Sequence, residues 1–157
     1  MGRDEEAVRQ YVESMARWLA DWGFPRMAAR VLIMMMSADE YSFTAADIAE
    51  RLEISPAAVS GAIRYLLQLE LVVREVVPGS RRDRYRIPHD TWYQAAMVKG
   101  GLFGQLAKLS AEGAAAAGGP ETPAGERLTE MSEFYVFLHE EVGGLLDKWR
   151  RHRASEG

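Results

Sequence analysis

The sequence predicts a mainly α-helical fold with one small β-hairpin, in which helices at both ends of the chain flank a compact central domain. Apolar residues recur at spacings of three and four along most of the chain, which is the period of an amphipathic helix. Extended character is confined to the valine-rich residues 71–77 and to the alternating residues 82–87, with a Pro-Gly-Ser turn between them. We therefore divide the chain into an N-terminal helix (1–24), a central domain (25–89) and C-terminal helices (90–157).

Composition and charge restrict the classes of function. The chain has 157 residues and no cysteine, which excludes a disulfide framework and a thiolate nucleophile or metal site. No apolar run approaches the ~20 residues of a membrane span, and the acidic N-terminus is unlike a secretory signal, so we expect a cytoplasmic protein without membrane contact. The net charge is −4, yet residues 54–88 hold six arginines against three acidic residues. A basic region inside an acidic chain is typical of a nucleic-acid footprint.

Two helices are predicted in the first quarter of the chain. Residues 4–22 carry an apolar seam made of Val8, Tyr11, Met15, Trp18 and Trp22. Gly23 is suited to end this helix, and Pro25 is suited to begin the next, because its missing N–H needs no partner there. The second helix, over 25–37, is apolar most of the way round and includes Met34, Met35 and Met36, so we expect it to be buried.

Capping residues define the two helices that follow. Thr44 and Asp47 form a variant of the capping box, at the start of a helix that ends near Leu52. Ser55 and Pro56 form an N-cap and first-turn pair for a helix over 55–69. The strands 71–77 and 82–87 then make a hairpin. In the second strand Arg82, Arg84 and Arg86 share one face, and Asp83, Tyr85 and Ile87 share the other.

The C-terminal part is predicted to hold two helices and a linker. Asp90 is a suitable N-cap for a helix over 91–112, and residues 113–125 are a low-complexity segment that we interpret as a flexible linker. The last helix, over 126–153, has an a/d seam of three heptads. One short chain can hardly cover such seams, so we favour a homodimer over packing within the chain. The expected interface residues are Val8, Tyr11, Met15, Trp18, Leu128, Met131, Tyr135, Leu138, Val142, Leu145 and Trp149.

The helices over 44–52 and 55–69, followed by the hairpin, make a helix-turn-helix with a wing. The inward stripe of the second helix is Val59, Ala62, Ile63, Leu66 and Leu67. Its other face is small and polar, which suits a helix in the major groove of duplex DNA, while the wing over 78–84 suits the minor groove. The expected DNA-binding residues are Ser55, Ala57, Ser60, Gly61, Arg64, Tyr65, Gln68, Arg81, Arg82 and Arg84.

The stretch FTAADIAERLEISPAAVSGAIRYLLQLELVVREVVPGSRRDRYRI, about residues 43–88, resembles the winged helix of MarR-type regulators, most closely the GbsR-like branch. The resemblance implies a dimer held by N- and C-terminal helices, with residues 55–68 as recognition helix and 81–84 in the wing tip. Ser80 stands where many wings of this family have an Asp that orients the wing arginine. Glu53 and Glu70 stand where such domains often have Gly, so we expect these two turns to differ in shape.

These observations predict a homodimeric, sequence-specific transcriptional regulator that binds double-stranded DNA, and we expect it to act as a repressor. The alternative is a winged-helix module that binds protein and not DNA. A small apolar effector or plain core packing would each account for Trp18, Trp22, Phe24, Met27, Trp92, Tyr93 and Phe103. We find no nucleophile–base pair, cofactor fingerprint or metal-ligand spacing, so we predict no enzyme activity, no cofactor and no metal.

Overall fold

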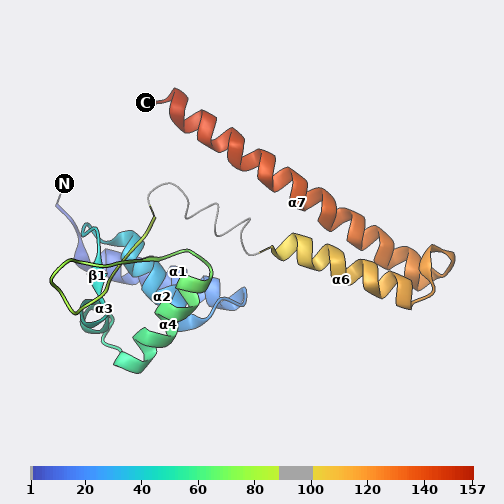
Figure 1. Cartoon of the computed structure of the whole chain (residues 1–157). Coiled ribbons are helices and arrows are strands. Elements are labelled where there is room, and N and C mark those ends of the chain that lie inside the picture. Colours follow the sequence, from blue (N-terminus) through green and yellow to red (C-terminus); the bar gives the residue numbers. More distant parts are fainter. Residues whose placement is uncertain (1, 89–100) are drawn as a thin grey trace. The chain divides into compact units, whose positions relative to one another are not determined.

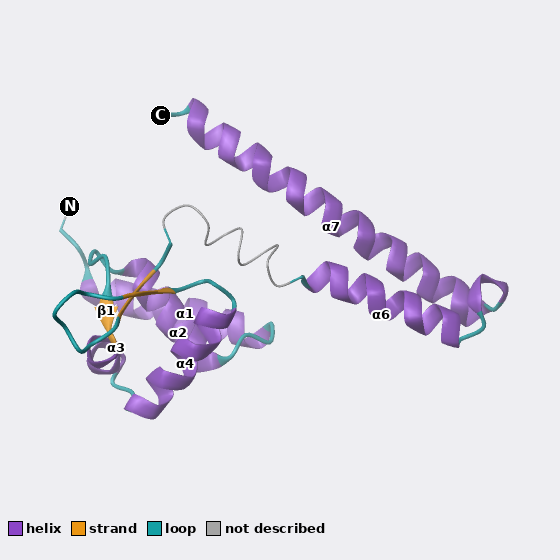
Figure 2. Cartoon of the chain, viewed as in Figure 1, coloured by secondary structure: helices purple, strands orange, loops and turns teal. Residues whose placement is uncertain are grey.

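The computed structural model describes residues 2–88 and 101–157, and the chain divides into two compact units, Met1–Trp92 and Tyr93–Gly157. Each unit is described by itself. The described part is mainly helical with one small antiparallel sheet, as the sequence predicts (Figure 1; Figure 2). The elements of the first unit are α1 (Glu5–Asp21), α2 (Arg26–Ser37), β1 (Phe43–Thr44), α3 (Ala45–Leu52), α4 (Pro56–Gln68), β2 (Val73–Glu75) and β3 (Arg84–Arg86).

Local signals end and begin these helices where the sequence predicts. Gly23 has a φ of 93° and donates its N–H to the carbonyl of Ala20, which closes the C-terminus of α1. Thr44 and Asp47 form a complete capping box at the start of α3, with each side chain accepting from the other residue's backbone N–H. These interactions join residues within a few positions of one another, so the helix limits follow from local sequence.

The core of the first unit is built around α2, which packs against α1, α3 and α4. Seven of its residues are buried, from Ala28 to Met35, because both sides of the helix are covered. Met36 is the exception to the predicted burial of the methionine run, since 41% of it is exposed. The helix turns Met36 away from its neighbours, while Met34 and Met35 fill the core.

Helix α1 belongs to the first unit, although the sequence suggested a separate N-terminal helix. It buries Val12 and Ala16, which lie beside the predicted seam and not on it. Arg30 of α2 reinforces the contact, because its Nη2 lies 2.8 Å from a carboxylate oxygen of Glu13 and its side chain is only 16% exposed. The seam residues Tyr11, Trp18 and Trp22 remain exposed by 49%, 57% and 76%. Their apolar surface is therefore left over after the unit has folded.

The sheet has the order β1–β3–β2, with both pairings antiparallel. The hairpin of β2 and β3 was predicted, but β1 was not, since a strand of two residues has no periodicity to detect. Phe43 pairs with Tyr85 and Thr44 pairs with Arg84. The third strand therefore joins the hairpin to the segment that leads into α3.

Glu53 and Glu70 take the left-handed backbone conformation, with φ of 53° and 56°. The expectation that these two turns would differ from those of a glycine was therefore wrong. Glu53 follows α3, and its N–H donates to the carbonyls of Ala49 and Glu50. A left-handed residue with a side chain costs on the order of 1 kcal/mol, and the helix-end hydrogen bonds offset that cost.

The second unit is a hairpin of α6 (Leu102–Ala116) and α7 (Pro123–Ser155), joined by the 3₁₀ turn η2 (Gly119–Glu121). The start of the predicted helix over 91–112, with its cap Asp90, lies outside the described residues. The expected flexible linker over 113–125 is instead the end of α6, the turn and the start of α7. None of the described helices combines the length and apolar character that a membrane crossing requires.

Close packing at the turn explains why this low-complexity segment is ordered. The alanine run continues α6, since alanine has the highest helix propensity. Thr122 caps α7 by accepting from the N–H of Gly125, and Pro123 occupies the first turn. A Cβ on Gly125 would lie 1.8 Å from the carbonyl oxygen of Gly119, so only glycine allows the chain to turn this tightly.

The predicted seam of the last helix is divided between two surfaces. Leu128, Ser132, Tyr135 and His139 face α6: Ser132 donates to the carbonyl of Ala107, and the Tyr135 ring stacks on Phe103 at 6.3 Å. Two of the expected dimer residues, Leu128 and Tyr135, thus pack within the chain. Exposed large apolar residues nevertheless remain on α7, and these are Met131, Phe134, Val136, Phe137, Leu145 and Trp149.

Candidate nucleic-acid interface

Helix α4 has one face in the core and one face in solvent. Ser55 begins it by accepting from the N–H of Ala58 at 3.1 Å, and Pro56 occupies the first turn. The buried residues are Val59, Ala62, Ile63 and Leu66, which confirms four of the five positions in the predicted inward stripe, while Leu67 is half-buried. The orientation of α4 is thus determined by its apolar stripe, which packs mainly against α2 and α3.

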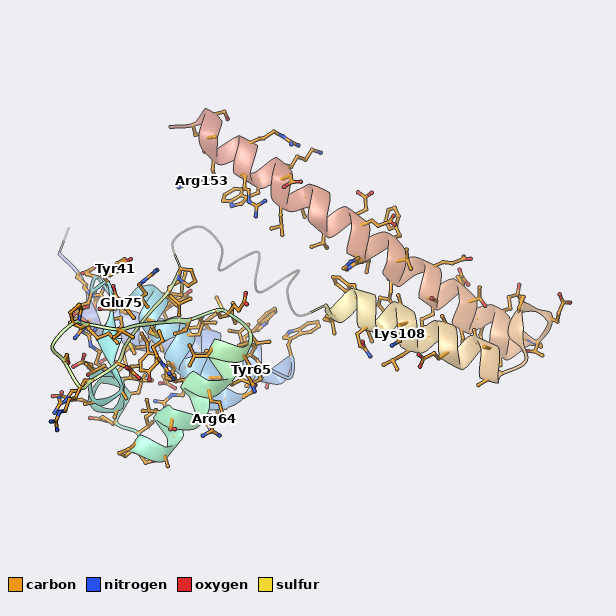
Figure 3. All side chains as sticks on the ribbon, in the orientation of Figure 1. Tyr41, Arg64, Tyr65, Glu75, Lys108 and Arg153 are labelled. Carbon is orange, nitrogen blue, oxygen red and sulfur yellow. The ribbon has the colours of Figure 1, made fainter. Side chains whose placement is uncertain are left out.

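The outer face of α4 consists of Ala57, Ser60, Gly61, Arg64 and Gln68, all of them exposed. A Cβ on Gly61 would have no heavy atom within 4 Å, so the fold itself does not require glycine there. Figure 3 shows Arg64 projecting from α4 away from the rest of the unit. A helix face with small side chains, and with hydrogen-bond donors at one end, can approach the edges of base pairs in the major groove closely.

Two of the predicted DNA-binding residues, Tyr65 and Ser55, already make contacts within the chain. Tyr65 is half-buried, and its ring meets Phe24 edge-on with centroids 5.3 Å apart. The Oγ of Ser55 accepts the capping hydrogen bond, which leaves its hydroxyl proton to donate. Tyr65 therefore helps to hold α1 and α2 against α4, while Ser55 still has a donor for an external oxygen.

The β2–β3 hairpin, hereafter the wing, has at its tip a tight turn that presents two arginines. Gly79 has a φ of 82°, and Ser80 donates its N–H to the carbonyl of Val77. Ser80 Oγ accepts from the N–H of Arg82 at 3.2 Å, so this serine braces the backbone of the tip. Arg81 and Arg82 are both exposed. The tip thus carries two cationic side chains on a fixed backbone.

Arg84 and Arg86 lie on the strand and not at the tip. The guanidinium of Arg84 donates from Nε to Ser42 Oγ at 2.8 Å and from Nη2 to the Ser42 carbonyl at 2.9 Å. The guanidinium of Arg86 lies over the ring of Tyr41, 5.5 Å from its centroid. Both arginines therefore contact the segment before β1. Sequence alternation grouped them with Arg82, because the third strand was not foreseen.

Sequence reasoning missed Arg74 as a member of this surface. Arg74 pairs with Tyr85 in the sheet register, and its guanidinium lies near that ring and 3.5 Å from a carboxylate oxygen of Asp83. With Ser60 and Arg64 it lines a hollow between the outer face of α4 and the wing. The sequence contains the arginine, but only the strand register brings it beside α4.

The start of α3 holds a carboxylate with a perturbed pKa. A hydrogen bond from the backbone N–H of Thr44 lowers the pKa of Asp47 below its usual 3.8, and the hydroxyl of Thr44 and the cations Arg84 and Arg51 act in the same direction. The burial of Asp47 opposes this shift. Ionised Asp47 therefore stabilises the end of β1 and the first helix of the helix-turn-helix together.

Asp47→Asn is expected to destabilise the protein by ~1 kcal/mol at neutral pH. Because the folded pKa is depressed, this contribution is complete above the unfolded value of 3.8 and is lost as pH falls through the lower folded value. The free-energy difference between parent and variant, measured by urea unfolding from pH 3 to 7, should be constant above about pH 5 and shrink below pH 3.8. A difference that does not depend on pH would contradict the assigned role.

Comparison with known proteins gives one consistent result. A model of the MarR family matches residues 22–83, and a model of MmpR5-like MarR family transcriptional regulators matches residues 90–152. The chain is 22% identical over 152 residues to the HTH-type transcriptional regulator MmpR5 of Mycobacterium tuberculosis. The matched region covers 97% of this chain and 92% of that protein. A crystal structure of a transcriptional regulator is similar with a TM-score of 0.80 at 22% identity, covering 92% and 99% of the two chains. The predicted fold is confirmed by this likeness.

Proposed function

Because the chain is a DNA-binding transcriptional regulator of the MarR family, matched by two models of that family over most of its length, we propose how it reads a duplex. Helix α4 enters the major groove, and the wing contacts the adjacent minor groove. The observation that carries this proposal is the open, small-residue outer face of α4, and the exposed pair of arginines at the tip of the wing supports it. Sequence specificity then comes from α4, and charge comes mainly from the wing.

The donors on this surface divide into three groups by the part of the duplex that each suits. Arg64 and Gln68 are exposed on the outer face of α4, from which they reach base edges. The Ser55 hydroxyl and the N-terminus of α4 are suited to a phosphate oxygen, because backbone N–H groups and the helix dipole favour an anion there. Arg81 and Arg82 suit the negative potential of a narrow minor groove.

Apolar surfaces that each unit leaves uncovered support the proposal of a homodimer. In the second unit, Phe134 and Phe137 are 55% and 57% exposed, because among its described residues α6 and the turn leave this side of α7 uncovered. In the first unit, α1 leaves Tyr11 and Trp18 exposed. Exposed apolar surfaces of this kind favour a second copy of the chain. Two copies would present two α4 helices to the half-sites of a pseudo-palindromic duplex, about one helical turn apart.

Three finer features stay predictions. Placement in the GbsR-like branch rests on the resemblance of residues 43–88 alone. Action as a repressor follows from no single residue, and it is tested by transcription from a promoter that carries the bound sequence. Response to a small apolar effector rests on the aromatic residues of α1 and on Trp92 and Tyr93, which lie outside the described residues.

The test of the wing is the salt dependence of DNA binding. Arg81→Ala with Arg82→Ala should weaken binding to all duplexes, because backbone contacts are largely independent of sequence. Each lost phosphate contact should flatten the slope of log K against log salt by ~0.9. The measurement is a titration of two duplexes, one selected by the protein from a random pool and one scrambled, at several salt concentrations.

A matched control removes the same charge elsewhere, by Arg127→Ala with Arg151→Ala at exposed positions of α7. This control should leave the slope close to that of the parent protein. A wing variant with an unchanged slope would mean that the tip does not touch the duplex, and absence of salt-dependent binding in the parent would favour a protein-binding module instead.

A further inference from the structure

The contact between Arg84 and Ser42 joins two segments that are 42 positions apart in the sequence. Arg84 Nε donates to the side-chain oxygen of Ser42 at 2.8 Å, and Nη2 donates to its carbonyl at 2.9 Å. The two residues are half-buried, and the guanidinium uses adjacent N–H groups in a fork. Such a two-point contact determines the orientation of the Arg84 guanidinium relative to Ser42 as well as the distance between the two residues.

Ser42 lies at the entrance to the helix-turn-helix. The next two residues form β1, and Thr44 both pairs with Arg84 in the sheet and caps α3. The wing strand β3 is therefore tied to the start of the helix-turn-helix by its two residue pairs with β1 and by one side-chain fork. Any tilt of the wing relative to α3 must break or stretch these bonds.

The wing by itself is too small to hold its own direction. Its strands β2 and β3 have three residues each, and an isolated two-stranded hairpin is marginally stable in water. The tip arginines, Arg81 and Arg82, contribute no such anchor, since both side chains are exposed. The direction of the tip must therefore be determined at its base, where β3 meets β1.

We propose that Arg84 is a positioning residue for DNA binding, which fixes the wing through Ser42 so that Arg81 and Arg82 reach the duplex. This inference rests on the proposed function of the wing. It separates the three arginines that the resemblance had placed together in the wing tip: Arg81 and Arg82 supply charge to the duplex, and Arg84 determines where that charge lies.

The test compares Arg84→Lys and Arg84→Ala in two backgrounds, the parent and the Arg81→Ala, Arg82→Ala variant. Lysine keeps the charge but cannot reproduce the two-point fork to Ser42. In the parent background, both substitutions should therefore weaken binding to the selected duplex by a similar factor, about tenfold. In the variant background neither should weaken binding further, because no tip arginines remain to be positioned.

Ser42→Ala removes the acceptor for Nε and provides a second route to the same result. It should weaken binding partially in the parent protein and have no effect when Arg84 is already alanine. Circular dichroism and thermal unfolding identify any variant that does not fold, in which case Ser42→Ala and Arg84→Lys carry the test. A role in overall stability alone would weaken binding equally in both backgrounds.

Two results would overturn the inference while leaving the wing in place. Arg84→Lys could bind like the parent protein, or Arg84→Ala could still weaken binding and flatten the salt slope by a further ~0.9 in the variant background, as a direct phosphate contact would. If the Arg81→Ala, Arg82→Ala variant itself binds like the parent protein, the proposed function of the wing fails and the inference fails with it.

Discussion

Gly61→Glu should abolish the preference of the protein for its selected duplex and lower its affinity by at least about a hundredfold. The substitution adds bulk and negative charge at the centre of the outer face of α4, where the proposed complex brings the helix against base edges and phosphates. Like charges placed together at an interface cost several kcal/mol. In a dimer both copies of α4 would carry the substitution, so binding to both half-sites of the duplex would be weakened. The measurement is a binding titration with the selected and the scrambled duplex.

The fold is expected to tolerate this change. A Cβ at position 61 meets no heavy atom within 4 Å, and glycine inside a helix is less favourable than alanine by roughly 0.5–1 kcal/mol. Gly61→Ala should therefore raise the thermal stability. Ala111→Glu, at an exposed position of α6, adds the same charge outside the proposed interface and should leave affinity unchanged. If Gly61→Glu binds like the parent, α4 does not lie in the groove.

Phe134→Glu with Phe137→Glu should convert the proposed dimer to a monomer. Burial of one phenylalanine contributes ~1.5–3 kcal/mol, and an unpaired carboxylate in its place adds a further penalty. With two positions changed in each copy, the dimer dissociation constant should rise by more than about a thousandfold. Sedimentation at micromolar concentration measures the change, and the affinity for a two-half-site duplex should fall with it.

The matched control is Phe134→Leu with Phe137→Leu, which keeps the exposed surface apolar and should leave the dimer intact. Both phenylalanines are more than half exposed in one chain, so the charged variant should keep the helical content of the hairpin. A parent protein that sediments as a monomer would refute the dimer. A charged variant that remains dimeric would move the interface to another surface, such as the aromatic residues of α1.

The two faces of α7 also show where prediction from sequence reaches its limit. A helix that is apolar on several sides has more than one seam to offer. The heptad period led us to one interface made of every a and d residue, but Leu128 and Tyr135 pack against α6 instead. Phe134 and Phe137 lie between the predicted positions and are exposed, whereas the predicted positions are split, since Met131, Leu145 and Trp149 are exposed as well. Which side of the helix is covered depends on a partner helix distant in the chain.

The sequence by itself determined the helices of the first unit, their limits, and the two faces of α4. Those features depend on caps such as Thr44 with Asp47 and on apolar spacing within a few turns, so they involve only neighbours along the chain. The placement of four of five expected stripe residues in the core follows from the same local period. The fold class and the helix proposed to read DNA were therefore accessible from the amino-acid order.

Only the tertiary structure decided how distant segments use their side chains. Arg84 contacts Ser42 and Arg86 contacts Tyr41 because β1 pairs with β3. The register of β2 with β3 places Arg74 at the hollow near α4. The turn at Gly125 replaced an expected linker, because glycine there lets the backbone approach Gly119. The contacts of Arg84 and Arg86 join segments far apart in the chain, and the turn at Gly125 depends on close backbone packing, so none of these outcomes leaves a period in the local sequence.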